Sequence, residues 1–243
     1  MKVRMTMIAL CVALSAPFLS SADANSDAPK ADVNSDAPEQ AKAAKRTGMP
    51  KFKPTNAGTP MTRLGGATRG NLASLARTEA LVPEETGHTL EAQPVLYWYL
   101  SATTEERIDF ALIGVDPINP MLEITLEGPF EPGIQRIRIA DLNANLEPGV
   151  SYQWFIRVIP NPDQRLYDRV VGGGIERLEK SAALQAKLDA AQPGDAHYLL
   201  AEAGIWYDAL DGLSMQIESS PNDANLLAQR AALFEQVGLK KLN

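Results

Sequence analysis

The chain has 243 residues, one cysteine, two histidines and a formal net charge of −7 at neutral pH. An acidic chain of this kind is a poor ligand for nucleic acids and is not drawn to anionic lipids. Its length allows one sizeable domain and an appendage. These totals argue against nucleic acid as a partner.

The N-terminal residues have the form of an export signal. Lys2 and Arg4 precede an apolar run from Met5 to Leu19, and Ala22-Asp23-Ala24 satisfies the small-residue rule for cleavage. The run is too short to serve as a membrane anchor. We therefore expect a signal peptide over residues 1–24, a location in the periplasm or outside the cell, and no integral membrane segment after cleavage.

A low-complexity leader follows this signal. Residues 22–30 are repeated almost unchanged at 31–39, and both copies are rich in alanine and aspartate. Such a composition cannot bury enough apolar surface to offset the entropy lost on ordering, so we expect a disordered leader over residues 25–60. The next stretch, 58–70, holds two arginines among glycines, but it lacks the strand and the Gly-Lys-Ser/Thr ending of a phosphate-binding loop. An ordered loop laid on the domain is the preferred interpretation.

Strand signals fill the region from residue 61 to residue 180. Six β-rich, largely alternating segments are separated by turn residues such as Asp116-Pro117, Gly128-Pro129 and Pro132-Gly133, and they lie at 94–100, 107–113, 121–127, 133–140, 152–158 and 167–178. Short alternating strands at this spacing are typical of an antiparallel β-sandwich.

The segment after Pro148-Gly149 suggests which kind of sandwich this is. Tyr152, Trp154, Ile156 and Val158 alternate with Gln153, Phe155 and Arg157, so we expect the first set to point inward and the second outward. The lead-in Leu-x-Pro-Gly-x-x-Tyr, which ends at Tyr152, resembles the tyrosine corner of immunoglobulin-like and fibronectin type III domains. The predicted class is therefore a mainly β fold of that type with a helical tail.

The tail, residues 181–243, has helical spacing. Ser181 can cap a first helix that Pro193-Gly194 ends, and Asp195 can cap a second. Residues 204–221 resemble the pattern of a tetratricopeptide helix pair, and a last helix is expected over 222–237. Such units normally need three or more copies to share a core. The tail must therefore pack on the sandwich or on a partner.

Several stretches together resemble one known family, namely residues 65–70, 80–86, 97–99, 152–155, 174–177 and 201–210. The family is the bacterial exported group known as domain of unknown function 928. The resemblance implies an architecture and a compartment, and no activity. Members commonly carry a cysteine after the Gly-Gly-x-x-Arg-Gly loop and another after the Tyr-x-Trp strand. Both are absent here, which is consistent with the loss of a family disulfide.

No motif for catalysis or cofactor binding is present. Cys11 lies in the signal, so the mature chain has no thiolate chemistry. His88 and His197 are far apart in sequence, and we expect them to be ordinary surface or boundary residues and not metal ligands. The acidic residues Glu84, Glu85, Glu105, Glu106 and Asp109 could supply a glycosidase pair, but loop acids are usually solvated. The sequence predicts no enzyme, no cofactor and no metal.

Aromatic residues are the remaining candidates for a site. If Trp98 and Trp154 point inward, Tyr97, Tyr99 and Phe155 point outward, where they either offer a platform for sugars or peptides or are covered by the leader or the tail. Coverage is the preferred interpretation. The candidate partner-binding residues are Tyr97, Tyr99, Phe155, Trp206 and Tyr207. The expected function is a protein–protein interaction module of the cell envelope, and the alternative is a carbohydrate-binding module that uses the outward aromatics.

Overall fold

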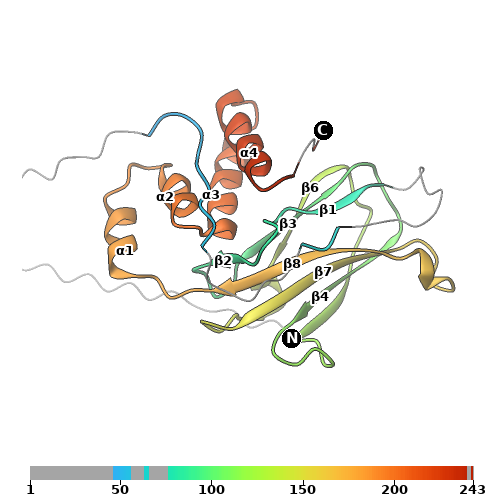
Figure 1. Ribbon diagram of the computed structural model, residues 1–243. Coiled ribbons are helices and arrows are strands. Elements are labelled where there is room, and N and C mark those ends of the chain that lie inside the picture. The colour runs from blue at the N-terminus through green and yellow to red at the C-terminus, as the bar shows by residue number, and fades with distance from the viewer. Residues whose placement is uncertain (1–45, 56–62, 66–75, 240–241, 243) are drawn as a thin grey trace, which may run out of the picture. The chain divides into compact units, whose positions relative to one another are not determined.

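Two β-sheets are followed along the chain by four helices (Figure 1). The computed structural model describes residues 46–55, 63–65, 76–239 and 242. The predicted signal peptide, the repeats of the leader and most of the Gly65–Gly70 loop lie outside these residues. Among the described helices, none combines the length and apolar character needed to cross a bilayer.

The smaller sheet has three antiparallel strands in the order β1-β3-β6. Its strands are β1 (Thr78–Ala80), β3 (Val95–Leu100) and β6 (Gly133–Arg138). Inside β3, Leu96, Trp98 and Leu100 belong to the apolar core. Because strand side chains alternate, Tyr97 and Tyr99 belong to the opposite face.

The larger sheet has five strands in the order β2-β8-β7-β4-β5. They are β2 (Gly87–Thr89), β4 (Arg107–Ile113), β5 (Leu122–Leu126), β7 (Ser151–Ile159) and β8 (Arg169–Arg177). All six predicted strands are present. The expectation of a purely antiparallel fold is wrong at β2, which pairs in parallel with β8. The two short 3₁₀ turns are η1 (Ile139–Leu142) and η2 (Arg165–Tyr167).

Strand β7 has the predicted alternation. Tyr152, Trp154, Ile156 and Val158 are buried, while Gln153, Phe155 and Arg157 are partly exposed on the other face. At the start of the strand, the Tyr152 hydroxyl accepts a hydrogen bond from the backbone N–H of Glu147 at 3.0 Å. The phenol is thus hydrogen-bonded to the preceding turn, as the Leu-x-Pro-Gly-x-x-Tyr pattern predicts.

The tail forms α1 (Ala182–Asp189), α2 (Ala196–Glu202), α3 (Trp206–Ser219) and α4 (Ala224–Gln236). The Ser181 hydroxyl caps α1 by accepting from the backbone N–H of Leu184, as predicted. Asp223 caps α4 in the same way. Asp195 precedes α2 but does not cap it, because its carboxylate accepts a hydrogen bond from the backbone N–H of Arg46 at 2.6 Å.

Helix α3 joins the tail to the sheets. The Trp206 indole donates to the carbonyl of Leu81 at 2.9 Å, and the Tyr207 hydroxyl donates to the carbonyl of Gly174 at 2.9 Å. Both side chains belong to the same apolar cluster as the sheet residues. The prediction that the tail packs on the sandwich is confirmed.

Residues 46–55, hereafter the strap, correct the prediction of a disordered leader. The strap lies along the helices: the backbone N–H of Lys53 donates to the carbonyl of Ala201 at 3.1 Å, and that of Phe52 to the Gln236 side chain at 2.8 Å. The Phe52 ring also meets the Trp206 ring edge-on, with centroids 5.0 Å apart. Composition failed here because one aromatic side chain and a few backbone bonds are enough to hold a short segment on an existing surface.

Candidate functional site

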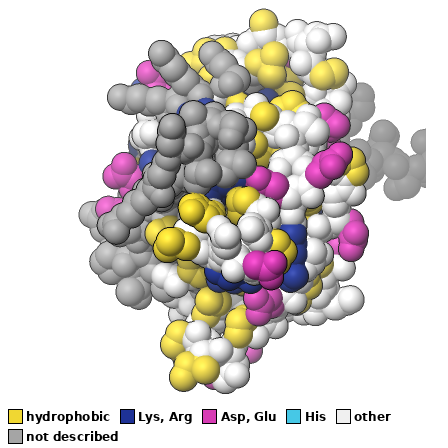
Figure 2. All heavy atoms as spheres, turned by 90° about the vertical axis from the view of Figure 1, so that its right-hand side faces the viewer, with side chains coloured by type: hydrophobic (Ala, Val, Ile, Leu, Met, Phe, Trp, Pro, Cys, Tyr) yellow, Lys and Arg dark blue, Asp and Glu magenta, His cyan; other side chains and the backbone are white. Residues whose placement is uncertain are grey.

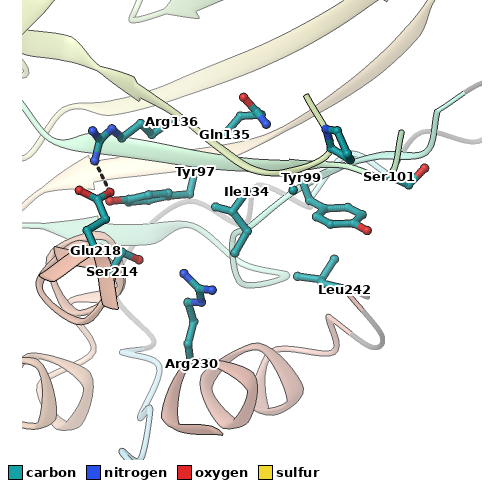
Figure 3. A pocket seen from close by; sticks show the side chains of 12 residues that line it. Tyr97, Tyr99, Ser101, Ile134, Gln135, Arg136, Ser214, Glu218, Arg230 and Leu242 are labelled. Carbon is teal, nitrogen blue, oxygen red and sulfur yellow. Dashed lines mark hydrogen bonds and ion pairs between the residues drawn. The ribbon is translucent and has the colours of Figure 1, made fainter. Parts of the chain in front are cut away.

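An open groove of about 790 Å³ lies between the outer face of the three-stranded sheet and the helices α3 and α4 (Figure 3). Strands β3 and β6 contribute one side, and the helices contribute the other. Cross-strand pairing places Tyr97 opposite Arg136 and Tyr99 opposite Ile134. The side chains that line the groove include Tyr97, Tyr99, Ile134, Arg136, Ser214, Glu218 and Arg230. Figure 2 shows a face of the molecule on which hydrophobic side chains lie between basic and acidic ones.

Tyr97 fastens helix α3 to the sheet. Its hydroxyl donates to the Asp211 carboxylate at 2.7 Å. Burial raises the pKa of Tyr97 well above its usual range, and the hydrogen bond to Asp211 raises it further, so the phenol stays protonated. Beside it, Ser214 is buried and lines the same groove.

Arg136 and Glu218 form an ion pair across the groove. The hydrogen bond between them raises the pKa of Arg136 and lowers that of Glu218. Both side chains are more than a third exposed. An ion pair as exposed as this stabilises a protein by at most about 1 kcal/mol, so its main effect is to neutralise one of the two arginines in the groove.

Arg230 is the uncompensated charge of the groove. Its side chain is partly buried and points from α4 toward the sheet (Figure 3). Burial lowers the pKa of Arg230, but a guanidinium remains a cation at any physiological pH. Across residues 46–55, 63–65, 76–239 and 242, the ion pairs join other arginines, and Arg230 takes part in none. A partly buried cation without a counter-ion favours the binding of an anion.

A second pocket of about 390 Å³ lies where α3 meets the chain after β2. There Asp208 accepts hydrogen bonds from the Thr89 hydroxyl and, at 2.9 Å, from the backbone N–H of Leu90. Burial raises the pKa of Asp208 to about 6; these two bonds oppose the shift, and the charges of Glu91 and Asp211 add to it. This carboxyl ties α3 to the sheet and carries a charge that depends on pH near neutrality.

The five predicted partner-binding residues do not form one surface. Tyr97 and Tyr99 reach the groove, with only 3% and 5% of their surface exposed. Phe155 lies on the outer face of the five-stranded sheet, because β3 and β7 belong to different sheets. Trp206 and Tyr207 are 0% and 1% exposed, so their prediction as contact residues is wrong: they serve as the core between α3 and the sheets.

The histidines are also placed differently from the expectation. His88 and His197 are buried, at 1% and 2% exposure, and so are neither surface nor boundary residues. His88 Nδ1 lies 2.8 Å from the Thr55 hydroxyl of the strap, and His197 Nε2 lies 2.8 Å from the Gln229 side chain. Burial lowers the pKa of His197. Within the described ranges, no cluster of three or more histidine, cysteine or acidic side chains could hold a metal ion.

Three of the acidic residues considered for catalysis have structural partners. Glu106 forms a partly buried ion pair with Arg169 at 2.7 Å. Asp109 accepts hydrogen bonds from Arg107 and Thr125, both at 2.8 Å; burial opposes its ionisation, but these bonds outweigh burial and lower the pKa of Asp109. Glu84 lies 3.9 Å from Arg63. The expectation that these acids are solvated is therefore wrong for Glu106 and Asp109.

Arg230 was not predicted as a site residue, although its sequence neighbours carry one signal. The positions three and four residues before and after it are Leu226, Leu227, Leu233 and Phe234, so no acidic side chain lies one helical turn away. An arginine on an apolar face of a helix has to find its counter-ion elsewhere. Its position beside Tyr97 and Arg136 depends on tertiary packing, which helical spacing does not report.

The family model described as Domain of Unknown Function (DUF928) matches residues 64–243. No curated protein matches the chain.

Proposed function

The chain belongs to the DUF928 family, and from that premise we propose that it is an exported, non-enzymatic interaction protein of the cell envelope whose partner binds in the groove between β6 and α4. The observation that carries this proposal is Arg230, a partly buried cation that faces an open groove and has no counter-ion among the described residues. A bound partner would supply that counter-ion. The groove also offers polar groups at Ser214 and Arg136.

A carbohydrate-binding module is the second candidate. Sugar rings bind by laying one face on an exposed aromatic ring, and Tyr97 and Tyr99 expose too little surface for this. Phe155 is the exception, because it is partly exposed between Gln153 and Arg157 on an outer sheet face. This candidate therefore depends on Phe155, which lies on the five-stranded sheet, whereas the groove with Arg230 borders the three-stranded sheet.

We further infer that the β domain is related to immunoglobulin-like and fibronectin type III sandwiches. The order β1-β3-β6 in one sheet and β8-β7-β4 in the other corresponds to strands A-B-E and G-F-C of those folds. The bond between Tyr152 and Glu147 supports the same inference. The helices α2 and α3 are consistent with a single tetratricopeptide-like pair and α4 with half of a second one, although α2, with 7 residues, is short for a helix of that repeat.

Export and the role of the groove have separate tests. If the signal is cleaved as proposed, mass spectrometry of the exported protein will give a mature chain that begins at Asn25 or within a few residues of it. An intact Met1 in an envelope fraction would contradict export.

The groove is tested by photo-crosslinking in cells that export the protein. A diazirine amino acid replaces Ile134, which points into the groove, or Ile113, a partly buried residue of β4 in the other sheet. We expect an adduct with an envelope protein from position 134 and none from position 113. Adducts from position 113 alone, or from neither position, would count against the proposed function.

A further inference from the structure

We propose that the partner is an extended polypeptide segment that adds to the open edge of β6 as a further strand and places a carboxylate on Arg230. This inference rests on the proposed function and names the class of ligand that the groove takes. Two features of the groove carry it: the direction of the backbone groups of β6 and the uncompensated charge of Arg230.

Strand β6 ends its sheet, so one of its edges faces away from β3. In an antiparallel ladder, residue pairs that exchange hydrogen bonds alternate with pairs that do not. The backbone N–H of Ile139 donates to the carbonyl of Pro94, which makes this a bonded pair; Tyr97–Arg136 and Tyr99–Ile134 are therefore pairs without bonds. The N–H and C=O groups of Ile134 and Arg136 consequently point toward the open edge.

That edge lies at the groove itself. Five consecutive residues, Pro132 to Arg136, line the groove. No backbone hydrogen bond of the described residues, apart from those inside the sheets and helices, involves Ile134 or Arg136. Unpaired strand edges are templates for an added strand, and peptide-binding domains use this mode by supplying main-chain bonds for affinity and side-chain contacts for selectivity.

Arg230 sets the charge of the added segment. Among the described residues, the charged side chains that line the groove are Arg136, Arg230 and Glu218, and the pairing of Arg136 with Glu218 leaves one positive charge. The chain as a whole is acidic, with a net charge of −7, so this cation is a local exception. A carboxylate matches the planar fork of a guanidinium and forms charge-assisted hydrogen bonds with it. The segment is therefore expected to carry an aspartate or a glutamate.

A second copy of the chain is a poorer occupant. Two β6 edges pairing antiparallel would bring Arg136 and Arg138 of one copy close to the same residues of the other. Like charges opposite each other on neighbouring strands are destabilising. Both arginines are exposed on β6, so the repulsion would fall at the centre of such an interface.

The test uses the mature protein and a phage library of random twelve-residue peptides. We expect the enriched peptides to share an acidic residue within a β-branched or aromatic context. Arg230→Gln should weaken their binding by about tenfold or more, as the loss of a charge-assisted bond predicts, while Arg230→Lys should retain part of it. Ile134→Pro removes a backbone N–H that points to the open edge and should weaken binding more than Ile134→Val, which retains that group.

Residue-resolved amide exchange decides whether a strand is added. On peptide binding to the unmodified protein, the amides of Ile134 and Arg136 should gain protection, while that of Gln135, which already bonds to β3, should stay unchanged. Equal exchange with and without peptide, enrichment of non-acidic peptides, no enrichment at all, or a stable dimer that blocks the groove would each overturn the inference. A crosslink from position 134 combined with unchanged exchange would reject strand addition and leave the proposed function standing.

Discussion

The indole N–H of Trp154, in the central strand β7, donates a hydrogen bond to the hydroxyl of Tyr207, in helix α3, at 2.9 Å. The same hydroxyl donates to the carbonyl of Gly174 in β8. One phenol thus satisfies a donor and an acceptor of the sheet in a region without access to water. The sheets cannot reach their final hydrogen bonding without the helix.

Tyr207→Phe removes this hydroxyl, which leaves the buried indole N–H of Trp154 unpaired and takes one hydrogen bond from the Gly174 carbonyl. We expect the free energy of unfolding to fall by about 1–3 kcal/mol, measured by urea denaturation. Tyr167→Phe makes the same chemical change at an exposed position and should alter stability by no more than about 0.5 kcal/mol. Equal effects of the two substitutions would show that the Tyr207 hydroxyl does not stabilise the junction.

Trp154→Ala tests the assignment of the two faces of β7. The indole is fully buried, so its removal should cost about 3–5 kcal/mol through lost transfer energy and packing. Gln153→Ala, on the other face, should cost no more than about 0.5 kcal/mol. Denaturation midpoints that move equally would contradict the assignment.

Asp208→Asn should change how stability depends on pH. The pKa of Asp208 is raised to about 6 in the folded protein, so protonation of this carboxyl favours the folded state. This stabilisation is complete below about pH 4 and is lost as the pH rises through 6. The asparagine does not ionise. The stability of the variant relative to the original protein should therefore increase by about 1–3 kcal/mol between pH 4 and pH 8, as measured by urea denaturation at several pH values. A difference that stays constant with pH would show that Asp208 does not titrate in this range.

Gly172→Ala tests the close approach of β8 to β7. A methyl group at this position would collide with the carbonyl of Trp154 and lie 2.8 Å from the Phe155 ring. We expect a loss of about 3 kcal/mol or more, visible as a lower Tm by circular dichroism. Gly65→Ala serves as the control, because open space surrounds that position and the change should be nearly neutral.

Phe52→Ala tests whether the strap contributes to stability. The ring is partly buried against Trp206, so its loss should lower the free energy of unfolding by about 1–2 kcal/mol, in proportion to the burial of a phenylalanine. Lys51→Ala, at the neighbouring exposed position, should have little effect. If both variants unfolded at the same urea concentration as the original protein, the Phe52 contact of the strap would make no contribution to stability.

The sequence correctly predicted the strands and helices that are long enough to show a regular pattern of apolar and polar residues. The alternation of Tyr152 to Val158 correctly assigned both faces of β7, and Ser181 correctly marked the start of α1. The strands β1 and β2 have three residues each, which is too few for an alternation to be recognised. Their positions depend on their partners β3 and β8.

The candidate site was predictable only in part. Tyr97 and Tyr99 were correctly placed on the outer face of β3, because strand periodicity fixes that face. What covers them depends on how α3 and α4 pack, and no local sequence pattern predicts that packing. The burial of His88 and His197 has the same origin, since each is enclosed by segments distant in the chain, such as Thr55 for His88 and Gln229 for His197.

The strap sets an order of events for a newly made chain. Arg46 bonds to Asp195, 149 residues later, and Phe52 bonds to Gln236, 184 residues later. Contacts over such separations form only after the loss of loop entropy, and they slow folding. The surface that receives the strap does not exist until α4 has been synthesised and has folded. A segment synthesised before the sheets and the helices is therefore the last to reach its place.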